Sequence, residues 1–270
     1  MNKGDISIFL RKIGLIYYLD FVRYKIHKVK NKTKNRSFKK KNPSVILPPD
    51  YLMYESFGID YEKYFDGGKK VGEWLKTYFK KYKNLNSLNI LDWGCGPARV
   101  IRHLPEVINN NCKFYGTDYN DESIKWCSEN ITNVSFSVNN LNPPLSYDEN
   151  LFDVIYGISI FTHLSENLHV NWLNELLRVT NKNGIIFLTM HGEVFKEILT
   201  SDEKKKFDEG KLIVRDKVKE GHRVFGAFHP TSFIKNLIKK MDYQVSILEH
   251  VPGKKINNRM EQDIWIIQKK

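Results

Sequence analysis

The stretch Leu88-Asn89-Ile90-Leu91-Asp92-Trp93-Gly94-Cys95-Gly96-Pro97-Ala98-Arg99 decides the fold of this 270-residue chain. Its first half has the apolar character of a buried parallel strand. Its second half is a glycine-rich turn, in which Gly94 and Gly96 let the backbone approach a ligand closely because they carry no Cβ. Pro97 suits the first position of a helix, where its missing N–H is not needed. We therefore expect a strand, a turn and a helix whose unpaired N–H groups face a nucleotide-type cofactor.

Two classes of cofactor compete for this turn. The dinucleotide fingerprint G-x-G-x-x-G requires glycine or another small residue where this chain has Arg99. The turn that holds S-adenosylmethionine (SAM), roughly D/E-x-G-x-G-x-G, is matched by Asp92, Gly94 and Gly96, and Ala98 replaces the third glycine. An acidic residue suits the ammonium group of SAM and would repel a pyrophosphate. The turn therefore favours SAM over NAD, and it favours either cofactor over a turn without a ligand.

The rest of the chain alternates strand-like and helix-like patterns. Further strands are predicted at residues 111–118, 152–159, 184–190, 223–229, 243–250 and 263–268. Such alternation predicts an α/β fold with a parallel, doubly wound sheet. The second strand ends in Asp118, an acid placed to accept hydrogen bonds from ribose hydroxyls. The hairpin-like last pair is a feature that a dinucleotide dehydrogenase would not need.

From these residues the chain resembles the class I SAM-dependent methyltransferases. The matching blocks are, in order, LDWGCGPAR, TDYNDESIKWC, NNLNPPL, FDVIYGISIFTHL and LLRVTNKNGIIFLTMHG, and the resemblance covers residues 65–200. It implies a Rossmann-like, seven-stranded sheet with an antiparallel last strand, preceded by an N-terminal helical arm or lid. The chain is most similar to small bacterial methyltransferases encoded among sugar-modification functions, which implies a role in polysaccharide biosynthesis.

The resemblance also implies which residues contact SAM. From the amino-acid end of the cofactor to its adenine, they are Asp92, Gly94, Gly96, Asp118, Tyr119, Asn139, Asn140 and Leu141. The first three face the amino-acid moiety, the acid of the second strand binds the ribose, and Tyr119 lies against the adenine. The loop 139–141 reaches the adenine edge, where many relatives carry Asp. An Asn there can accept through its oxygen and donate through its NH₂ group, and which Asn points inward stays open.

Three histidines fall at predicted strand ends, namely His163, His229 and His191. A neutral imidazole is a good general base near neutral pH, and a hydroxyl acceptor needs one. His163 is the first candidate, because the segment after the fourth strand borders the methyl group in this fold; His229 is second and His191 third. A catalytic imidazole predicts a kcat/KM that rises with pH near an unperturbed pKa of about 6.5. A structural role is the alternative for each of them. No His, Cys and Asp cluster has metal-ligand spacing, so no metal is expected.

The net charge of +12 is concentrated at the N-terminus. Residues 1–42 hold 13 Lys and Arg against 2 Asp and Glu, whereas the remaining residues hold 30 and 29. Because the body is nearly neutral, nucleic acid is not expected as a partner. Apolar residues recur at helical spacing over residues 5–30, which predicts either a helix on an anionic membrane or a helix packed on the body or in a dimer. Residues 31–43 are predicted to be a mobile basic linker.

We therefore expect three parts: a basic amphipathic arm and linker over residues 1–42, a helical lid segment over 43–84, and a SAM-binding methyltransferase domain over 85–270. In the lid segment a helix is expected at 69–83, after the Gly67-Gly68 pair. Three cysteines without metal-type spacing, together with no signal peptide or apolar span, predict reduced thiols in a cytoplasmic protein. The alternative of an arm on an anionic membrane makes this protein membrane-peripheral. Cys95 is expected to fill space in the turn.

The expected function is methyl transfer from SAM to an O or N atom of a small-molecule or glycan-type acceptor. The alternative is an RNA or protein methyltransferase that uses the basic arm to hold a macromolecule. A SAM-binding protein without catalysis is argued against by the intact acids Asp92 and Asp118. An NAD-linked oxidoreductase is disfavoured by Arg99. The oligomeric state is left open.

Overall fold

The computed structural model describes residues 3–108 and 110–270. The chain divides into two compact units, one formed by residues 18–140 and the other by residues 141–270 with the first 17 residues. The elements of the first unit are α2 (Ile16–Lys41), α3 (Asp50–Ser56), α4 (Tyr61–Tyr82), β1 (Asn89–Trp93), η1 (Ile101–His103), α5 (Leu104–Ile108), β2 (Lys113–Asp118), α6 (Asp121–Asn130) and β3 (Ser135–Val138). β1 pairs in parallel with β2, and β2 pairs in parallel with β3. Ile90 and Leu91 are fully buried, which explains the unbroken apolar run of β1.

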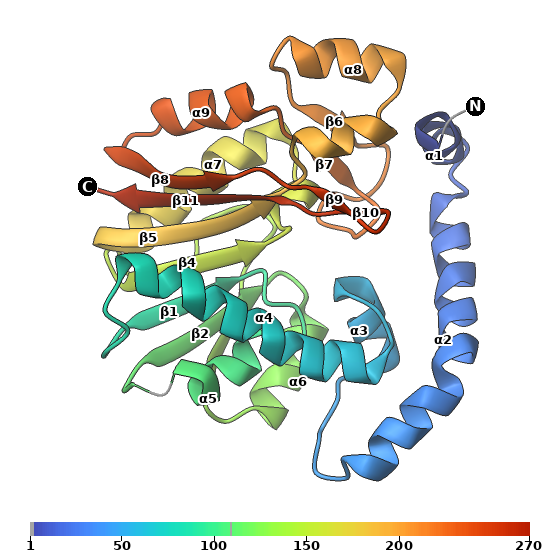
Figure 1. The fold of residues 1–270 in the computed structure, drawn as a ribbon, viewed down its shortest axis with the longest axis horizontal. Helices are drawn as coiled ribbons and strands as arrows, with labels where there is room; N and C mark the ends of the chain where they lie inside the picture. Colours follow the sequence, from blue (N-terminus) through green and yellow to red (C-terminus); the bar gives the residue numbers. More distant parts are fainter. Residues whose placement is uncertain (1–2, 109) are drawn as a thin grey trace. The chain divides into compact units, whose positions relative to one another are not determined.

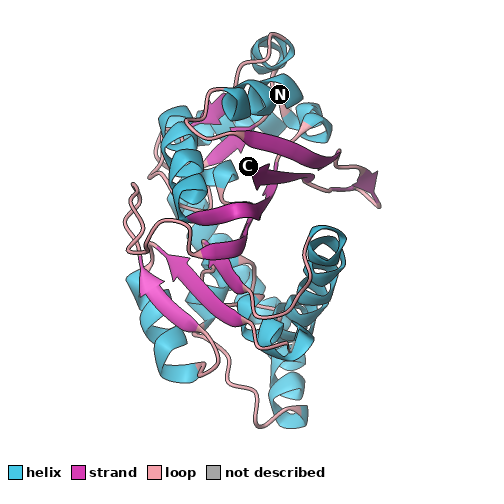
Figure 2. Ribbon diagram, turned by 90° about the vertical axis from the view of Figure 1, so that its left-hand side faces the viewer, coloured by secondary structure: helices cyan, strands magenta, loops and turns pink. Residues whose placement is uncertain are grey.

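The second unit begins with α1 (Lys3–Lys12) and continues after residue 140. Its further elements are β4 (Phe152–Ile158), η2 (Phe161–His163), α7 (Glu166–Val179), β5 (Thr180–Met190), η3 (Glu193–Ile198), α8 (Ser201–Asp208), β6 (Ile213–Arg215), β7 (Gly226–Phe228), α9 (Thr231–Lys239), β8 (Val245–Val251), β9 (Lys255–Ile256), β10 (Arg259–Met260) and β11 (Asp263–Lys269). β4 and β5 run parallel, and β11 is antiparallel to both β5 and β8. The short β9–β10 hairpin extends from the ends of β8 and β11 (Figure 2).

The main sheet has the strand order β3-β2-β1-β4-β5-β11-β8 (Figure 1). This is the predicted α/β, doubly wound, seven-stranded sheet, and the antiparallel strand is β11, the last in the chain. All the predicted strands are present. Their bounds differ from the predictions by a few residues, and β5 begins earliest, at Thr180 instead of at Gly184. The β6–β7 pair forms a separate antiparallel sheet.

The N-terminal helices differ from the sequence prediction. Helix α2 continues to Lys41, so the prediction of a mobile linker over residues 31–43 is wrong. Tertiary contacts hold this polar segment helical: the Asn35 side chain donates to the Ile59 carbonyl at 2.6 Å and accepts from the Tyr61 N–H at 3.0 Å. The Phe38 ring is buried in the same region. Helix α1 is separated from α2 at Gly14, whose φ is +72°.

Two further helices begin at residues other than those that the sequence predicts. The helix expected at 69–83 begins at Tyr61, because the Asp60 side chain caps it by accepting from the Lys63 N–H. The Gly67-Gly68 pair therefore lies inside α4. A Cβ at Gly68 would be 2.1 Å from the Arg99 carbonyl oxygen, so this glycine is required by the close approach of α4 to the backbone. A Cβ added at Gly67, by contrast, would have no atom within 4 Å.

The helix expected directly after the glycine turn is also absent. Residues 94–100 continue as turns, with Ala98 at a φ of +59°, and helical structure begins only at Ile101. The Pro97 carbonyl accepts a hydrogen bond from the hydroxyl of Tyr64 in α4 at 2.9 Å. Pro97 therefore contacts α4 and does not occupy the first position of a helix. Further along the chain, residues 193–220 contain η3, α8 and the strand β6.

The two neighbouring glycines of α4 make a matched test of this packing. We expect Gly67→Ala to raise the free energy of unfolding by about 0.5–1 kcal/mol, because alanine removes backbone freedom from the unfolded chain and meets no atom. Gly68→Ala should lower it by about 1–3 kcal/mol, because the methyl group overlaps the Arg99 carbonyl. Urea unfolding followed by circular dichroism measures both. Equal effects of the two substitutions would contradict the position of α4.

Candidate functional site

The turn after β1 is held by the end of β2. The Gly94 and Cys95 N–H groups both donate to the Thr117 carbonyl, at 2.8 and 3.0 Å. Gly94 has a φ of +74° and Gly96 a φ of +52°, values that residues other than glycine rarely adopt. A Cβ at Gly96 would also lie 3.1 Å from the Cβ of Ser56 in α3. The turn therefore needs glycine at 94 for conformation and at 96 for conformation and space.

Asp118, at the end of β2, clamps the same turn. One carboxylate oxygen accepts from the Gly96 N–H and the other from the Asn120 N–H, both at 2.8 Å. Burial raises the pKa of Asp118, and backbone hydrogen bonds from Asn120, Gly96 and Tyr119 act in the opposite direction. Each carboxylate oxygen has a second lone pair, so the acid keeps capacity for ribose hydroxyls. The predicted ribose ligand is thus also a structural part of the turn.

Asp92 and Cys95 lie buried at the carboxyl end of β1. Burial raises the pKa of the Cys95 thiol, and the nearby charges of Asp92 and Asp118 raise it further. A Cβ at Gly116 would be 3.0 Å from the Cys95 sulfur, so the thiol occupies space against β2. This agrees with a space-filling role for Cys95, since a thiol with a raised pKa is a poor nucleophile.

Glu55 in α3 is a residue that the sequence analysis missed. Its carboxylate accepts from the Asn120 amide at 3.5 Å. Burial, followed by the charges of Asp118 and Glu55, raises the pKa of the Tyr119 hydroxyl to about 12. Tyr119 itself is 37% exposed, as a residue that lies against a ligand must be. No local pattern marks Glu55, because it comes from the lid segment and meets Asn120, at the start of α6, only in the folded chain.

Two further contacts join the lid segment to the turn. The Arg99 guanidinium lies 4.3 Å from the ring centre of Phe57, which follows α3. The second is the hydrogen bond of Tyr64 to the Pro97 carbonyl. Arg99, which excludes the dinucleotide fingerprint, therefore has an aromatic partner in this fold.

The two asparagines of the adenine loop differ in their surroundings. The Asn139 side chain accepts from the Thr117 hydroxyl at 2.8 Å and donates to the Asn140 carbonyl at 2.6 Å, which ties it to β2. The Asn140 side chain is exposed. The Leu141 carbonyl accepts from the Trp172 indole at 2.9 Å. Asn140 is therefore the better candidate for a contact to the adenine edge.

The residues of the unit 18–140 fit SAM. Asp92, Asp118 and Glu55 supply carboxylates to a ligand that carries a sulfonium and an ammonium group. Gly94 and Gly96 leave the turn backbone open to close approach. The sequence-based prediction that the turn holds the amino-acid end of SAM and Asp118 its ribose is compatible with these positions. Within residues 3–108 and 110–270, no group of three or more His, Cys, Asp or Glu side chains is arranged to hold a metal ion.

The structure brings the three candidate histidines together around β7 in the other unit. Nδ1 of His163 lies 3.2 Å from the Phe225 carbonyl, and Nδ1 of His191 lies 3.1 Å from the Ala227 carbonyl. Because a carbonyl only accepts, each Nδ1 carries the proton and each Nε2 keeps a lone pair. Burial lowers the pKa of both histidines to about 4. The expected pKa near 6.5 is therefore wrong for either residue, and both are neutral at pH 7.

His229 has a different environment from the other two histidines. Its Nε2 lies 2.8 Å from Nε2 of His169, whose Nδ1 donates to the Ser165 carbonyl at 2.7 Å. In the neutral pair the proton between the two rings therefore belongs to His229. A further proton on Nδ1 of His229 would complete its 3.3 Å contact with the His191 carbonyl, but would place a charge in the core. Nε2 of His229 is thus already engaged, which makes His229 a weaker base candidate than His163 or His191.

The buried histidine pair predicts a pH-dependent stability. Burial lowers the pKa of His169 to about 4 and that of His229 well below 6.5, so the unfolded chain binds more protons than the folded chain in the window between pH 6.5 and 4. We expect the free energy of unfolding to be constant above pH 7 and to fall as the pH drops through this window. His169→Gln should make the decline shallower by about 1.4 kcal/mol per pH unit. Denaturant titrations from pH 7.5 to 5 measure this, and an unchanged slope would contradict the assignment.

Comparisons with known proteins agree with this fold. Residues 84–246 match a family model described as a methyltransferase domain. A SAM-dependent methyltransferase from Methanosarcina mazei is similar, with a TM-score of 0.53 and 16% identity, over 72% of this chain and 96% of that one. Magnesium protoporphyrin IX methyltransferase from Synechocystis, solved with bound S-adenosylhomocysteine, has a TM-score of 0.54 and 12% identity, over 92% and 100%.

A phosphoethanolamine N-methyltransferase from Haemonchus contortus has the same TM-score of 0.54, at 14% identity, over 91% of this chain and 49% of that one. At such identities these structures show a shared fold. The family model, by contrast, covers more than half of the chain and includes the glycine turn and Asp118. The chain therefore belongs to the methyltransferase-domain family and is a SAM-dependent methyltransferase.

Proposed function

We propose that this enzyme methylates a hydroxyl group of a small-molecule or glycan-type acceptor and that His163 accepts the hydroxyl proton. The observation that carries this proposal is the state of the imidazole. The Phe225 carbonyl keeps the proton of His163 on Nδ1, and burial keeps the imidazole neutral. Nε2 of His163 therefore carries a free lone pair at pH 7. A hydroxyl must lose its proton as the methyl group arrives, whereas an amine already free of its proton needs no base.

When bound, SAM supplies a methyl group that its sulfonium already activates. The remaining work of the chain is to align the acceptor, to exclude water and to take up one proton. His191 shares the protonation state of His163 and is the second candidate for this proton. Asp92 and the turn orient the amino-acid end of the cofactor, and Asp118 orients its ribose. An oxygen acceptor is the form of the reaction that uses all of these groups.

The choice of a small acceptor is supported by the charge distribution. Residues 43–270 are nearly neutral, with 30 Lys and Arg against 29 Asp and Glu, so the body carries little of the net positive charge that favours RNA binding. Two of the structural neighbours act on a porphyrin and on phosphoethanolamine, according to their names. The glycan class and a place in polysaccharide biosynthesis rest on the resemblance of the sequence to sugar-modifying methyltransferases.

The acceptor class is tested by the fate of the methyl group. The purified enzyme is incubated with methyl-labelled SAM in three separate reactions. The first contains a panel of sugars and sugar nucleotides, the second total RNA and the third unfolded protein. We expect label in the carbohydrate panel, in a form stable to base as an ether is. Label in RNA or protein instead, lost when exposed Lys and Arg residues of the arm (residues 1–42) are replaced by Gln, would establish the alternative function.

Asp118 is tested through the ribose of the cofactor. We expect Asp118→Asn to weaken SAM binding by about 1–3 kcal/mol in calorimetry, because the ribose hydroxyls lose their charged acceptor. The wild type should also prefer adenosine to 2′,3′-dideoxyadenosine, and the variant should lose this preference. Asp121→Asn, an exposed acid three residues further on, is the matched control and should change neither value. A variant that binds SAM weakly but keeps the preference would restrict Asp118 to a structural role in the turn.

His163 is tested through turnover. His163→Gln should lower kcat by about 10²–10⁴-fold and leave SAM affinity nearly unchanged. Because a base works in its neutral form and the pKa of His163 is about 4, wild-type kcat/KM should be flat from pH 6 to 8 and fall only toward pH 4. His191→Gln and His229→Gln rank the alternatives under the same assay. Near-normal turnover of all three variants would show that alignment alone drives transfer, and the base would be discarded.

A further inference from the structure

Helix α2 packs on its own unit with a polar and aromatic face. The residues of this inward face recur every three or four positions and are Asp20, Tyr24, His27, Asn31, Asn35 and Phe38. The Tyr54 hydroxyl donates to the Asp20 carboxylate at 2.9 Å, and the ring of Tyr54 lies 5.2 Å from that of Tyr24. Together with the Asn35 hydrogen bonds, these contacts fix the rotation of the helix about its axis.

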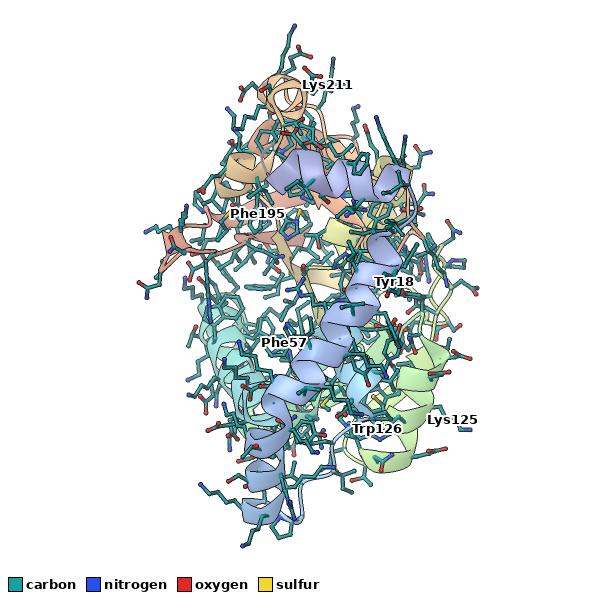
Figure 3. All side chains as sticks on the ribbon, turned by 90° about the vertical axis from the view of Figure 1, so that its right-hand side faces the viewer. Tyr18, Phe57, Lys125, Trp126, Phe195 and Lys211 are labelled. Atoms are coloured by element: carbon teal, nitrogen blue, oxygen red, sulfur yellow. The ribbon has the colours of Figure 1, made fainter. Side chains whose placement is uncertain are left out.

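The opposite face of α2 carries an apolar patch, formed by Tyr18, Leu19, Val22, Ile26 and Val29. Tyr18 is 65%, Ile26 58% and Val29 74% exposed, and Leu19 is 41% exposed. Figure 3 faces α2 and labels Tyr18 at the N-terminal half of the helix. The spacing 18, 22, 26, 29 is that of a single helical stripe. An exposed apolar stripe on the side opposite the packed face indicates a surface that binds a partner or a membrane.

The charges around the patch indicate what binds. The same stripe continues into Thr33, Arg36 and Lys40, which are exposed, and the last two of these residues are basic. Residues 18–41 contain 10 Lys and Arg and a single acid, Asp20, which is turned inward to Tyr54. A second copy of the chain would bring two basic helices together and repel. A surface that is apolar at its interior and anionic at its border is complementary to this pattern.

We propose that the outward face of α2 docks on an anionic lipid surface. The apolar patch enters the boundary between headgroups and acyl chains, while Arg36 and Lys40 meet lipid phosphates and long lysine side chains extend toward the headgroups. The helix lies on the membrane and does not cross it: among the described residues, no helix is both long and apolar enough to cross one. The methyltransferase is thereby held at a membrane surface.

Vesicle co-sedimentation of the full chain tests the proposal. We expect binding to vesicles of phosphatidylcholine with phosphatidylglycerol, little binding to phosphatidylcholine alone, and weakening by salt. The double variant Ile26→Ser/Val29→Ser should bind about tenfold more weakly or worse, because it removes two apolar side chains from the patch. The matched control is Ile46→Ser/Ile256→Ser, which changes two isoleucines that are 52% and 49% exposed elsewhere, and it should bind as the wild type does.

The basic half of the stripe is tested separately. Arg36→Gln/Lys40→Gln should lose much of the salt-sensitive binding, whereas Lys235→Gln/Lys239→Gln, exposed and equally spaced on α9, should not. Circular dichroism and melting temperature check that each variant folds. Equal binding to neutral and anionic vesicles, or no effect of either α2 variant, would overturn the proposal. A second outcome would also overturn it: light scattering detects a dimer, Ile26→Ser/Val29→Ser dissociates this dimer, and the wild type does not bind vesicles.

Discussion

The hydrogen bonds that Asp118 accepts from Gly96 and Asn120 are the interaction on which the cofactor unit depends. Through them one buried carboxylate joins the end of β2, the turn after β1 and the start of α6. The cost of burying the charge is offset in part by backbone N–H donors, although burial prevails and the pKa of Asp118 is raised. The same acid is the proposed ribose ligand, and under this proposal structural support and ligand recognition share one side chain.

The lid segment is built on this turn and not appended to it. Gly68 allows α4 to meet the Arg99 carbonyl, Tyr64 binds the Pro97 carbonyl, and Ser56 of α3 lies against Gly96. These contacts come from residues that are 30 to 40 positions apart in the chain. They explain why the turn continues to residue 100 before helical structure begins: its carbonyls are oriented toward α4. The lid segment also brings Glu55 to Asn120, which adds a third carboxylate to the site.

The histidines of the other unit illustrate how burial and a carbonyl partner determine chemistry. His163 and His191 have the same arrangement, a proton on Nδ1 directed to a carbonyl of the β7 segment and a pKa lowered to about 4. An imidazole in this state is a weak base but one that is never protonated at neutral pH. His229 is committed to His169, which makes it part of the core. Side chains of one type at three neighbouring places thus have different partners and protonation patterns.

The sequence by itself determined the strand–turn–acid arrangement of Asp92, Gly94, Gly96 and Asp118 and the α/β class, because these follow from local patterns of apolar residues and glycines. The antiparallel last strand was implied by the resemblance of the sequence to the methyltransferase family. The tertiary structure alone decided the helicity of residues 31–41, the place of Gly68, the partners of Asn139, the contact of Glu55 and the pKa values of the histidines. Each of these depends on a partner far away in the chain, such as Ile59 for Asn35, Arg99 for Gly68 and Phe225 for His163. The identity of such a partner, and the burial that comes with it, exist only once the chain has folded.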